Sequence, residues 1–499
     1  MKLLTKLLLI TSLPFLLLSG CSEQIETVVI EDAPQSASPK CNRDTLQYKA
    51  QMPNSFRHIS VGEFSDIISF DPLFARTPGA KRAVQMVYEG LVRLDGNGNV
   101  LPAIAKGWEI TSDSLSYEFT LRDNIFFQDS QVFANGLGRK VRPADFVFLF
   151  HRMALKDVPP DAGRLFMSIE GFEPYFREQR NTYMSRERKQ NGINGIGAPN
   201  DSTLVFNLVH KDPKFLQKLA SPYAVVYPRE AITADSSKLH NDPTGSGPFQ
   251  LSSSRSDSLF IFKKNGDYSF VSSQSKKVRA DRVDLIKFNN ELKLIRKFAD
   301  GELDLIAELP PQTLQAFINS DLALKSAHNN AFNVHSGGKI NYTAFYNSSN
   351  RDDLSYSKVA GILKNYPQDD FAATVNSGAI SINPSPAFEA ADAQSYGNTI
   401  FTTLTQDPYL QLLYMQMSSE LQKKNIDFKI LNTFITNSNV HMYSRRISNL
   451  EKLQDQEEPL FKASVEHVAL ARKELTNFSL NDNNWWFDLR ETGRAPLNR

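Results

Sequence analysis

The sequence predicts a mixed α/β protein with more than one domain. The chain has 499 residues, of which 41% are hydrophobic, so it holds enough apolar material for large cores. In some segments apolar and polar residues alternate, as in half-buried strands, and in others apolar residues recur every three to four positions, as in amphipathic helices. Because both patterns are spread along the chain after about residue 53, we expect α/β or α+β lobes.

Turn residues and alternating apolar residues predict strands in three regions. Segments 91–94 and 100–101 flank the Gly- and Asn-rich segment 95–99, which indicates a β-hairpin. A half-buried strand is predicted from the alternating residues Leu115, Tyr117, Phe119 and Leu121. A third strand is predicted from Leu204, Phe206 and Leu208.

Helix starts and stops are also marked in the sequence. Pro143 is suited to the first turn of a helix whose apolar face is Phe146, Leu149, Phe150 and Met153. Segment 292–300 reads as a helix ended by Gly301, with a strand resuming over 303–306. Asp407 and Pro408 are an N-cap and first-turn pair for a helix that carries Leu410, Leu413, Met417 and Leu421.

The first twenty residues have the composition of a signal peptide. Lys2 and Lys6 precede an apolar run from Leu7 to Leu18, which is shorter than the ~20 residues of a membrane-spanning helix. The run ends in Leu-Ser-Gly-Cys, which resembles the lipobox of bacterial lipoproteins and implies cleavage before Cys21 and acylation of that residue. The alternative is an ordinary cleaved signal followed by a chance cysteine. The residue after the cysteine is Ser22 and not Asp, which would permit sorting to the outer membrane, so the sequence leaves open which membrane holds the protein.

Segment 21–52 is polar and aperiodic, so we predict a flexible tether behind the lipidated cysteine. Only two cysteines are present, so lipidation of Cys21 would leave Cys41 as a free thiol or a partner for an intermolecular bridge. The net charge of +1, with basic residues dispersed, argues against a nucleic-acid-binding surface.

Several segments are similar to the motifs of one protein family and occur in the same order along the chain. They are Ser69–Pro72, Val87–Leu94, Leu101–Ile110, Tyr117–Arg122, Asp242–Phe249, Leu303–Asp304, Tyr342–Asn347 and Glu420–Asp427. In this order they resemble the oligopeptide/dipeptide/nickel-binding family of bacterial extracellular solute-binding proteins. The resemblance runs from about Ser55 to the C-terminus, and its motifs are more specific in the first half of the chain.

The resemblance implies a two-lobe fold of the periplasmic binding protein type (type II, cluster C) that closes around a ligand. It implies a discontinuous domain I, an extra domain II and a hinged domain III. The expected boundaries are 53–87, 198–288 and 463–499 for domain I, 88–197 for domain II and 289–462 for domain III. Between Ile430 and Pro459 the chain is shorter than is usual in the family and lacks its Asp-Pro element, so a remodelled or smaller ligand is possible.

Candidate ligand-binding residues follow from the same resemblance. Asp71 either faces ligand or caps a turn, and Phe70 either stacks on ligand or packs in the core. Tyr346 and Asn347 belong to a family strand near the hinge and cleft. Arg445, with Arg446 beside it, is suited to a ligand carboxylate, or else to solvent.

Two further candidate ligand-binding residues lie near the C-terminal end of the sequence. Trp485 and Trp486 are adjacent, so on a strand at most one of them can line a cleft.

The eight histidines show no metal-ligand spacing, and Gly245-Ser246-Gly247 is not a nucleophile elbow. We therefore expect no catalytic residues, no metal, no cofactor and no enzymatic activity.

The expected function is that of an extracytoplasmic, lipid-anchored and monomeric binding protein of an ABC importer. Its partners would be a peptide or another small polar solute, a membrane permease, and the bilayer through Cys21. Nickel chelates and haem stay open as ligands because scaffold motifs do not specify ligand class. The alternative is a surface lipoprotein, a sensor or interaction partner, that keeps the fold without transport.

Overall fold

The computed structural model describes most of the chain after residue 56. The described residues are 57–181, 192–235, 237–255, 258–268, 279–319, 323–348, 356–363, 399–403, 407–431, 440–447, 459–476, 478 and 493–494. The predicted leader and tether, with Cys21 and Cys41, lie outside this set, as do Trp485 and Trp486.

The described strands form one large sheet of ten strands, in the order β14-β13-β15-β12-β16-β11-β1-β10-β9-β8. β1 runs parallel to both of its neighbours, β10 and β11, whereas β12 runs antiparallel to β15 and β16. The strands are β1 (His58–Glu63), β8 (Phe249–Arg255), β9 (Leu259–Lys264), β10 (Arg282–Lys287), β11 (Leu305–Ile306), β12 (Phe332–Ser348), β13 (Thr399–Thr403), β14 (Asp427–Leu431), β15 (Val440–Ile447) and β16 (Pro459–Arg472).

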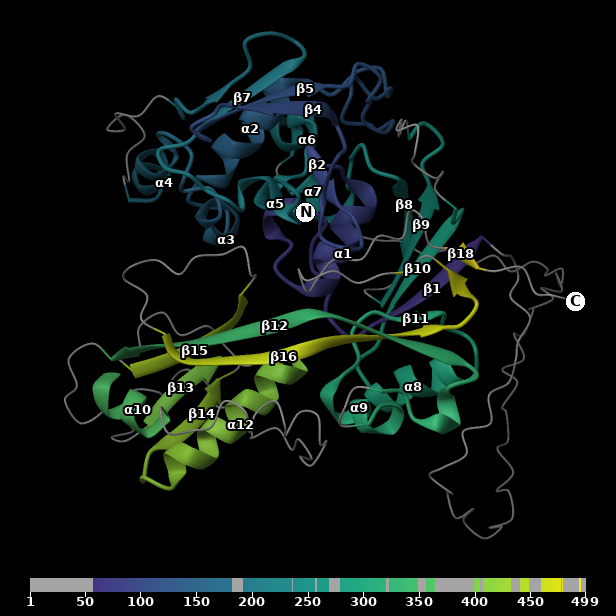
Figure 1. Cartoon of the computed structure of the whole chain (residues 1–499), viewed down its shortest axis with the longest axis vertical. Coiled ribbons are helices and arrows are strands. Elements are labelled where there is room, and N and C mark those ends of the chain that lie inside the picture. The colour runs from purple at the N-terminus through teal and green to yellow at the C-terminus, as the bar shows by residue number, and fades with distance from the viewer. Residues whose placement is uncertain are drawn as a thin grey trace, which may run out of the picture. The chain divides into compact units, whose positions relative to one another are not determined.

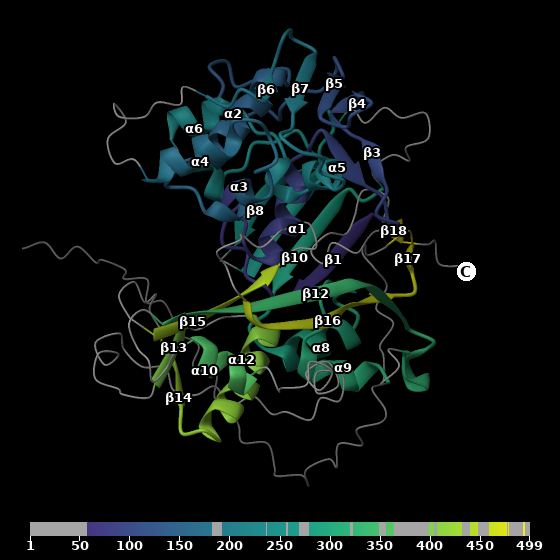
Figure 2. The same ribbon diagram turned by 60° about the vertical axis from the view of Figure 1, so that its left-hand side comes forward.

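The longest pairing in this sheet joins β12 to β16. The two strands pair from Phe332 opposite Arg472 to Phe345 opposite Pro459, with irregularities at Ser336/Lys339 and Ala344/Phe345. Figure 1 and Figure 2 both show these strands side by side, with helices α8 (Glu291–Ala299), α10 (Tyr356–Leu363) and α12 (Pro408–Gln422) on one side of them.

A second sheet has four strands in the order β4-β5-β7-β6, and two two-stranded sheets pair β2 with β3 and β17 with β18. These strands are β2 (Val92–Leu94), β3 (Val100–Pro102), β4 (Ala105–Ile110), β5 (Ser116–Leu121), β6 (Ile196–Gly197), β7 (Thr203–Asn207), β17 (Leu475–Thr476) and β18 (Gly493–Arg494). The remaining described helices are η1 (Pro72–Phe74), α1 (Pro78–Val87), α2 (Pro143–Met153), α3 (Pro160–Arg164), α4 (Phe172–Asn181), α5 (Phe215–Leu219), η3 (Pro222–Ala224), α6 (Arg229–Ala234), α7 (Lys238–Asn241), α9 (Pro311–Phe317) and η5 (Ser326–His328). None of the described helices is both long and apolar enough to cross a membrane.

Two hydrophobic cores meet at the middle strands of the large sheet. In β11, Leu305 belongs to the first core and its neighbour Ile306 to the second. In β16, Ala469 and Ala471 belong to the first core, while Val468 and Leu470 belong to the second. Successive side chains of a strand point to opposite faces, so these strands present one face to each core.

Most of the predicted elements are confirmed. β2 and β3 form the hairpin, and Gly98 in its turn has a φ of 80°, a conformation that glycine adopts without strain. The predicted face of α2 is fully buried, and Asp407 caps α12 by accepting hydrogen bonds from the backbone N–H groups of Tyr409 and Leu410. The strand predicted over 303–306 is shorter in the structure, since β11 begins at Leu305.

Candidate functional site

Asp71 lies at the start of η1, where the sequence left open a ligand contact or a turn cap. Its side chain is fully buried, and its Oδ1 atom accepts a hydrogen bond of 3.1 Å from the backbone N–H of Leu73. The backbone N–H of Asp71 in turn donates to Ser69 Oγ at 3.0 Å. These contacts are those of a turn-capping residue.

The same carboxylate forms a buried ion pair that sequence reasoning missed. Arg152 of α2 donates from Nη1 to Asp71 Oδ1 at 2.9 Å and from Nη2 to Oδ2 at 2.5 Å. Nη1 also donates to the hydroxyl of Tyr227 at 2.9 Å. Burial disfavours the charged guanidinium, but Tyr227 and Asp71 outweigh it and raise the pKa of Arg152. Arg152 therefore joins η1 to α2.

Phe70 packs in the first core, which was the second of its two predicted roles. Its side chain is 3% exposed, and its ring meets those of Phe260 and Phe262 edge-on, with centroid distances of 5.6 and 6.1 Å. Phe260 and Phe262 lie on β9, so Phe70 fixes the segment before η1 against the large sheet.

The structure brings three other candidates onto neighbouring strands of the large sheet. Tyr346 and Asn347 lie on β12, and Arg445 lies on β15. The register pairs Asn347 with His441 and Arg445 with Thr343, so the backbone positions of Asn347 and Arg445 are four residues apart along the ladder, or about 13 Å. Tyr346 is half-buried and packs against the second core.

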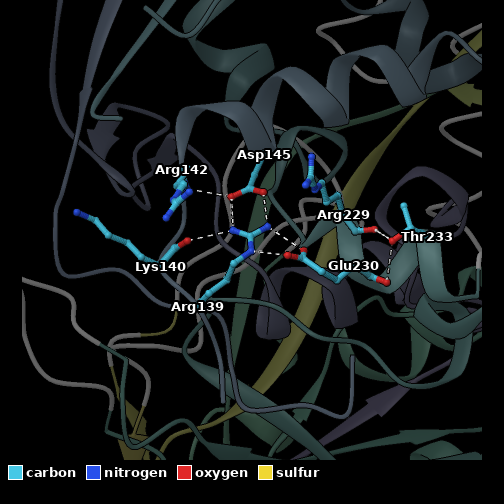
Figure 3. A network of polar contacts seen from close by, with 7 residues as sticks. All are labelled: Arg139, Lys140, Arg142, Asp145, Arg229, Glu230 and Thr233. Atoms are coloured by element: carbon cyan, nitrogen blue, oxygen red, sulfur yellow. Dashed lines mark hydrogen bonds and ion pairs between the residues drawn. The ribbon is translucent and has the colours of Figure 1, made fainter. Parts of the chain in front are cut away.

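A charged network holds α2 and α6 together. Figure 3 shows the Arg139 guanidinium between the carboxylates of Asp145 on α2 and Glu230 on α6. Arg139 donates to Asp145 at 2.9 and 2.6 Å and to Glu230 at 2.7 and 2.8 Å. Hydrogen bonds from Arg139 lower the pKa of Glu230. Asp145 also accepts a hydrogen bond from the backbone N–H of Arg142, so it caps α2 as well.

A second buried ion pair lies at the end of β1. Glu63 and Arg82 of α1 are 0% and 2% exposed, and the guanidinium donates to the carboxylate at 2.7 and 2.6 Å. Burial raises the pKa of Glu63, and Arg82 opposes that shift. Nearby, Nε2 of the buried His467 lies 3.2 Å from the carbonyl oxygen of Ala307 and 3.9 Å from the Glu308 carboxylate.

The Gly245–Gly247 turn, part of the family-like segment Asp242–Phe249, packs on the end of α1. A Cβ atom on Gly245 would lie 2.1 Å from the carbonyl oxygen of Val87, and one on Gly247 would lie 2.6 Å from it. The backbone N–H of Gly247 donates to the same oxygen at 2.8 Å. Only residues without a side chain allow this approach. Within the described ranges, no group of three or more His, Cys, Asp or Glu residues is placed to hold a metal ion.

The mixed α/β fold is that of the type II periplasmic binding proteins, to which the similar solved structures belong. The model of the bacterial extracellular solute-binding proteins, family 5, matches residues 99–359. Because that match covers more than half of the chain, the chain belongs to this family.

Individual relatives cover less of the sequence. Di/tripeptide-binding protein 1 of Pseudomonas aeruginosa is 30% identical over 193 residues, 37% of this chain and 33% of that protein. Heme-binding protein A of Haemophilus influenzae is 24% identical over 307 residues, 56% of this chain and 52% of that protein. The matched regions thus span between about a third and a half of these two relatives.

Among solved structures, the chain is similar to the periplasmic binding protein DppA of Helicobacter pylori in complex with the peptide STSA. The TM-score is 0.61 at 16% identity, and the alignment covers 88% of this chain and 98% of that one. At this identity the similarity establishes the fold. The two-lobe architecture predicted from the sequence motifs is confirmed at the level of fold class.

Proposed function

We propose that the protein is the lipid-anchored, extracytoplasmic binding component of an ABC importer, and that it captures peptides or similarly sized polar solutes for a membrane permease. The observation that carries the proposal is the family match over residues 99–359. The peptide-binding relative and the peptide-bound structure support a peptide as the first ligand class to test.

The ligand would lie along the strand pair β12 and β15, between Tyr346 and Asn347 on β12 and Arg445 on β15. An extended peptide offers a backbone N–H and C=O at every residue, so binding of its main chain gives affinity without sequence preference. Arg445 is the residue suited to a ligand carboxylate. The chain lacks the family's Asp-Pro element between residues 430 and 459, which favours a short peptide or a smaller solute over a long one.

The expected domain boundaries cut through one of the two cores. The first core contains Ile59, Phe119 and Phe206, from both sides of the boundaries expected at 87/88 and 197/198. Domains I and II would therefore share one core, and domain III would be built on the second. Closure would take place where the two cores meet.

The ligand is identified by extraction from the protein purified from its own host. Acid release and mass spectrometry would give a peptide or another small polar solute, and adding that compound back to the stripped protein would raise its melting temperature. Recovery of haem or a nickel chelate would replace the peptide with that ligand. If no compound is recovered and none stabilises the stripped protein, a surface protein without transport is favoured.

Substitutions in the strand pair test where the ligand binds. Arg445→Ala and Asn347→Ala are expected to weaken ligand affinity at least tenfold, which corresponds to about 1.4 kcal/mol. Arg177→Ala is the matched control, because Arg177 is 66% exposed on α4 and pairs only locally with Glu173. If all three variants bind with the affinity of the unsubstituted protein, the ligand binds elsewhere.

The anchor is tested separately through Cys21. The full chain, expressed in a bacterial host with labelled palmitate, is expected to take up label and to partition with membranes. Cys21→Ser should lose both properties, whereas Cys41→Ser should keep them. Label on the Cys21→Ser variant would contradict lipidation at that residue.

A further inference from the structure

His151 lies in the last turn of α2 and is held at both of its ring nitrogens. Its Nδ1 atom lies 2.8 Å from the carbonyl oxygen of Val147, one turn earlier in the same helix. Its Nε2 atom accepts a hydrogen bond of 3.3 Å from the backbone N–H of Ile193. A carbonyl oxygen can only accept a hydrogen bond and a backbone N–H can only donate one. The two contacts therefore define a neutral imidazole with its proton on Nδ1 and a lone pair on Nε2.

The segment that donates to the imidazole, residues 192–197, is packed closely onto its surroundings. Ile193 is 4% exposed and belongs to the first core. A Cβ atom on Gly192 would lie 3.2 Å from His151 Nε2, so the absence of a side chain there allows the close approach to the ring. The segment continues into β6, which is the edge strand next to β7 in the four-stranded sheet. The imidazole thus ties α2 to the start of an edge strand.

The orientation of the ring is fixed by α4. The Tyr175 ring of that helix is 9% exposed and meets the His151 ring edge-on, with a centroid distance of 5.3 Å. Turning the imidazole by 180° would place carbon atoms where the two nitrogens now lie, and both hydrogen bonds would be lost. The ring therefore cannot respond to a change of charge by exchanging the roles of its nitrogens.

Most charged side chains of α2 and α4 have partners of their own. The contacts are those of Asp145 with Arg139, Arg152 with Asp71, Arg177 with Glu173, and Arg180 with the carbonyl oxygen of Val158. The other carboxylates of these elements are Glu178, on α4, and Glu170, just before it. Segment 192–197 contains no charged residue, so the imidazole is the titratable group that contacts the Ile193 N–H directly.

We propose that His151 is an acid-sensitive clip whose protonation releases segment 192–197 from α2. A protonated imidazole carries a proton on each nitrogen, so Nε2 would turn a donor toward the N–H of Ile193 and the hydrogen bond would be lost. In the released segment the ring is in water and can bind the proton. Release also uncovers the edge of β7 that β6 covers in the docked form. The clip does not depend on the proposed ligand or on transport.

The sign of the pH dependence follows from proton binding. The docked form binds fewer protons than the released form, so docking is favoured at high pH and is weakened as the pH falls through the range in which histidine titrates. An imidazole in water has a pKa of about 6.5, so exclusion of the proton from the docked form raises the ratio of released to docked segment about thirtyfold between pH 7.5 and pH 5.

Native-state hydrogen exchange of the full chain between pH 7.5 and pH 5 tests the clip. After correction for intrinsic exchange rates, the protection of the Ile193 amide is expected to fall about thirtyfold. His151→Gln keeps an acceptor for this N–H but does not titrate, so its protection should not change over this range. His210→Gln is the matched control, because His210 is exposed and follows β7, and it should keep the full pH dependence.

Two outcomes of the exchange experiment overturn the proposal. One is a pH dependence in His151→Gln that equals that of the unsubstituted protein. The other is a pH dependence that disappears in Glu170→Gln or Glu178→Gln, since a carboxylate would then be the titrating group.

Nitrogen-15 NMR of protein labelled at histidine gives a readout that needs no substitution. At pH 7.5 the His151 ring should carry its proton on Nδ1 and none on Nε2, and the loss of Ile193 protection should follow the appearance of the doubly protonated ring. A proton on Nε2 at pH 7.5, or a loss of protection that is complete before the ring takes up its second proton, overturns the proposal.

Discussion

Arg152 and Asp71 are 81 residues apart in sequence and form a bidentate, almost completely buried ion pair. The pair connects the last turn of α2 to the N-cap of η1, and its guanidinium also contacts Tyr227. The ion pair therefore fixes η1 against α2. In the structure, the Asp71 carboxylate thus contacts both its own turn and α2.

We expect Asp71→Asn to destabilise the protein by about 3–5 kcal/mol, because it leaves the Arg152 charge buried without a counter-charge. The measurement is the free energy of unfolding in urea. The double variant Asp71→Asn, Arg152→Met should lose less than the sum of the single variants, since it leaves no unpaired charge. A loss below about 1 kcal/mol for Asp71→Asn alone would contradict the buried pairing.

Asp212 should make the stability of the protein depend on pH in acid. Burial opposes its ionisation, but hydrogen bonds from Lys218 at 2.5 Å and Ser168 at 2.9 Å outweigh burial and lower the pKa of Asp212. A carboxylate with a lowered folded-state pKa adds stability above its unfolded value of about 3.9, and that stability is lost as the pH falls through the lower folded value.

Asp212→Asn should therefore lower the melting temperature at pH 6 and approach the unsubstituted protein as the pH falls below about 4. Asp201→Asn is the matched control, because Asp201 is exposed, and it should leave the melting temperature unchanged at every pH. A deficit for Asp212→Asn that stays constant between pH 6 and pH 3 would show that its ionisation is not the cause.

Gly245→Ala should be among the most damaging small substitutions in the chain. Its methyl group would lie 2.1 Å from the backbone oxygen of Val87, so the turn or the end of α1 must move. We expect a loss of about 3 kcal/mol, the upper end of overpacking costs. Gly266→Ala meets nothing within 4 Å and should change the unfolding free energy by less than about 0.5 kcal/mol. Equal effects of the two variants would exclude the close approach.

Glu230→Gln should lower stability by about 1 kcal/mol, because Arg139 and Glu230 are partly buried and linked to Asp145 in one network. Glu173→Gln, in an exposed pair with Arg177, should have almost no effect. Raising the salt concentration should reduce the Glu230→Gln deficit only in part, since buried charges are screened less. A larger effect for Glu173→Gln would contradict this ranking.

The predictable parts of the fold were those with local signals. The period of residues 115–121 and the helix starts at Pro143 and Asp407 depend on neighbours within one turn or strand, and the structure confirms them. The length of β12 was not predicted, since only residues 342–347 were recognised as a strand. Its 17 residues are stabilised by pairing with β15 and β16, whose contacts lie about a hundred or more residues away.

In the candidate site, too, local signals were predictable and distant contacts were not. Motif order identified the family, and the caution that Asp71 might cap a turn agrees with its contacts. The partners Arg152 and Tyr227 could not be found, because an ion pair across 81 residues leaves no periodic trace in the sequence. The ion pair between Glu63 and Arg82 could not be predicted either, because the sequence does not show that these two charged residues are buried.

The central claim is that the protein binds a small solute between the parts built on its two cores. It is tested most directly by titrating the stripped, refolded protein with di-, tri- and tetrapeptide libraries and recording the unfolding free energy. We expect a saturable 1:1 stabilisation that follows RT ln(1 + [L]/Kd), about 2.7 kcal/mol at a hundredfold excess over Kd, and that is reduced in Arg445→Ala. No stabilisation by peptides, haem or nickel chelates in a correctly refolded protein would contradict the account.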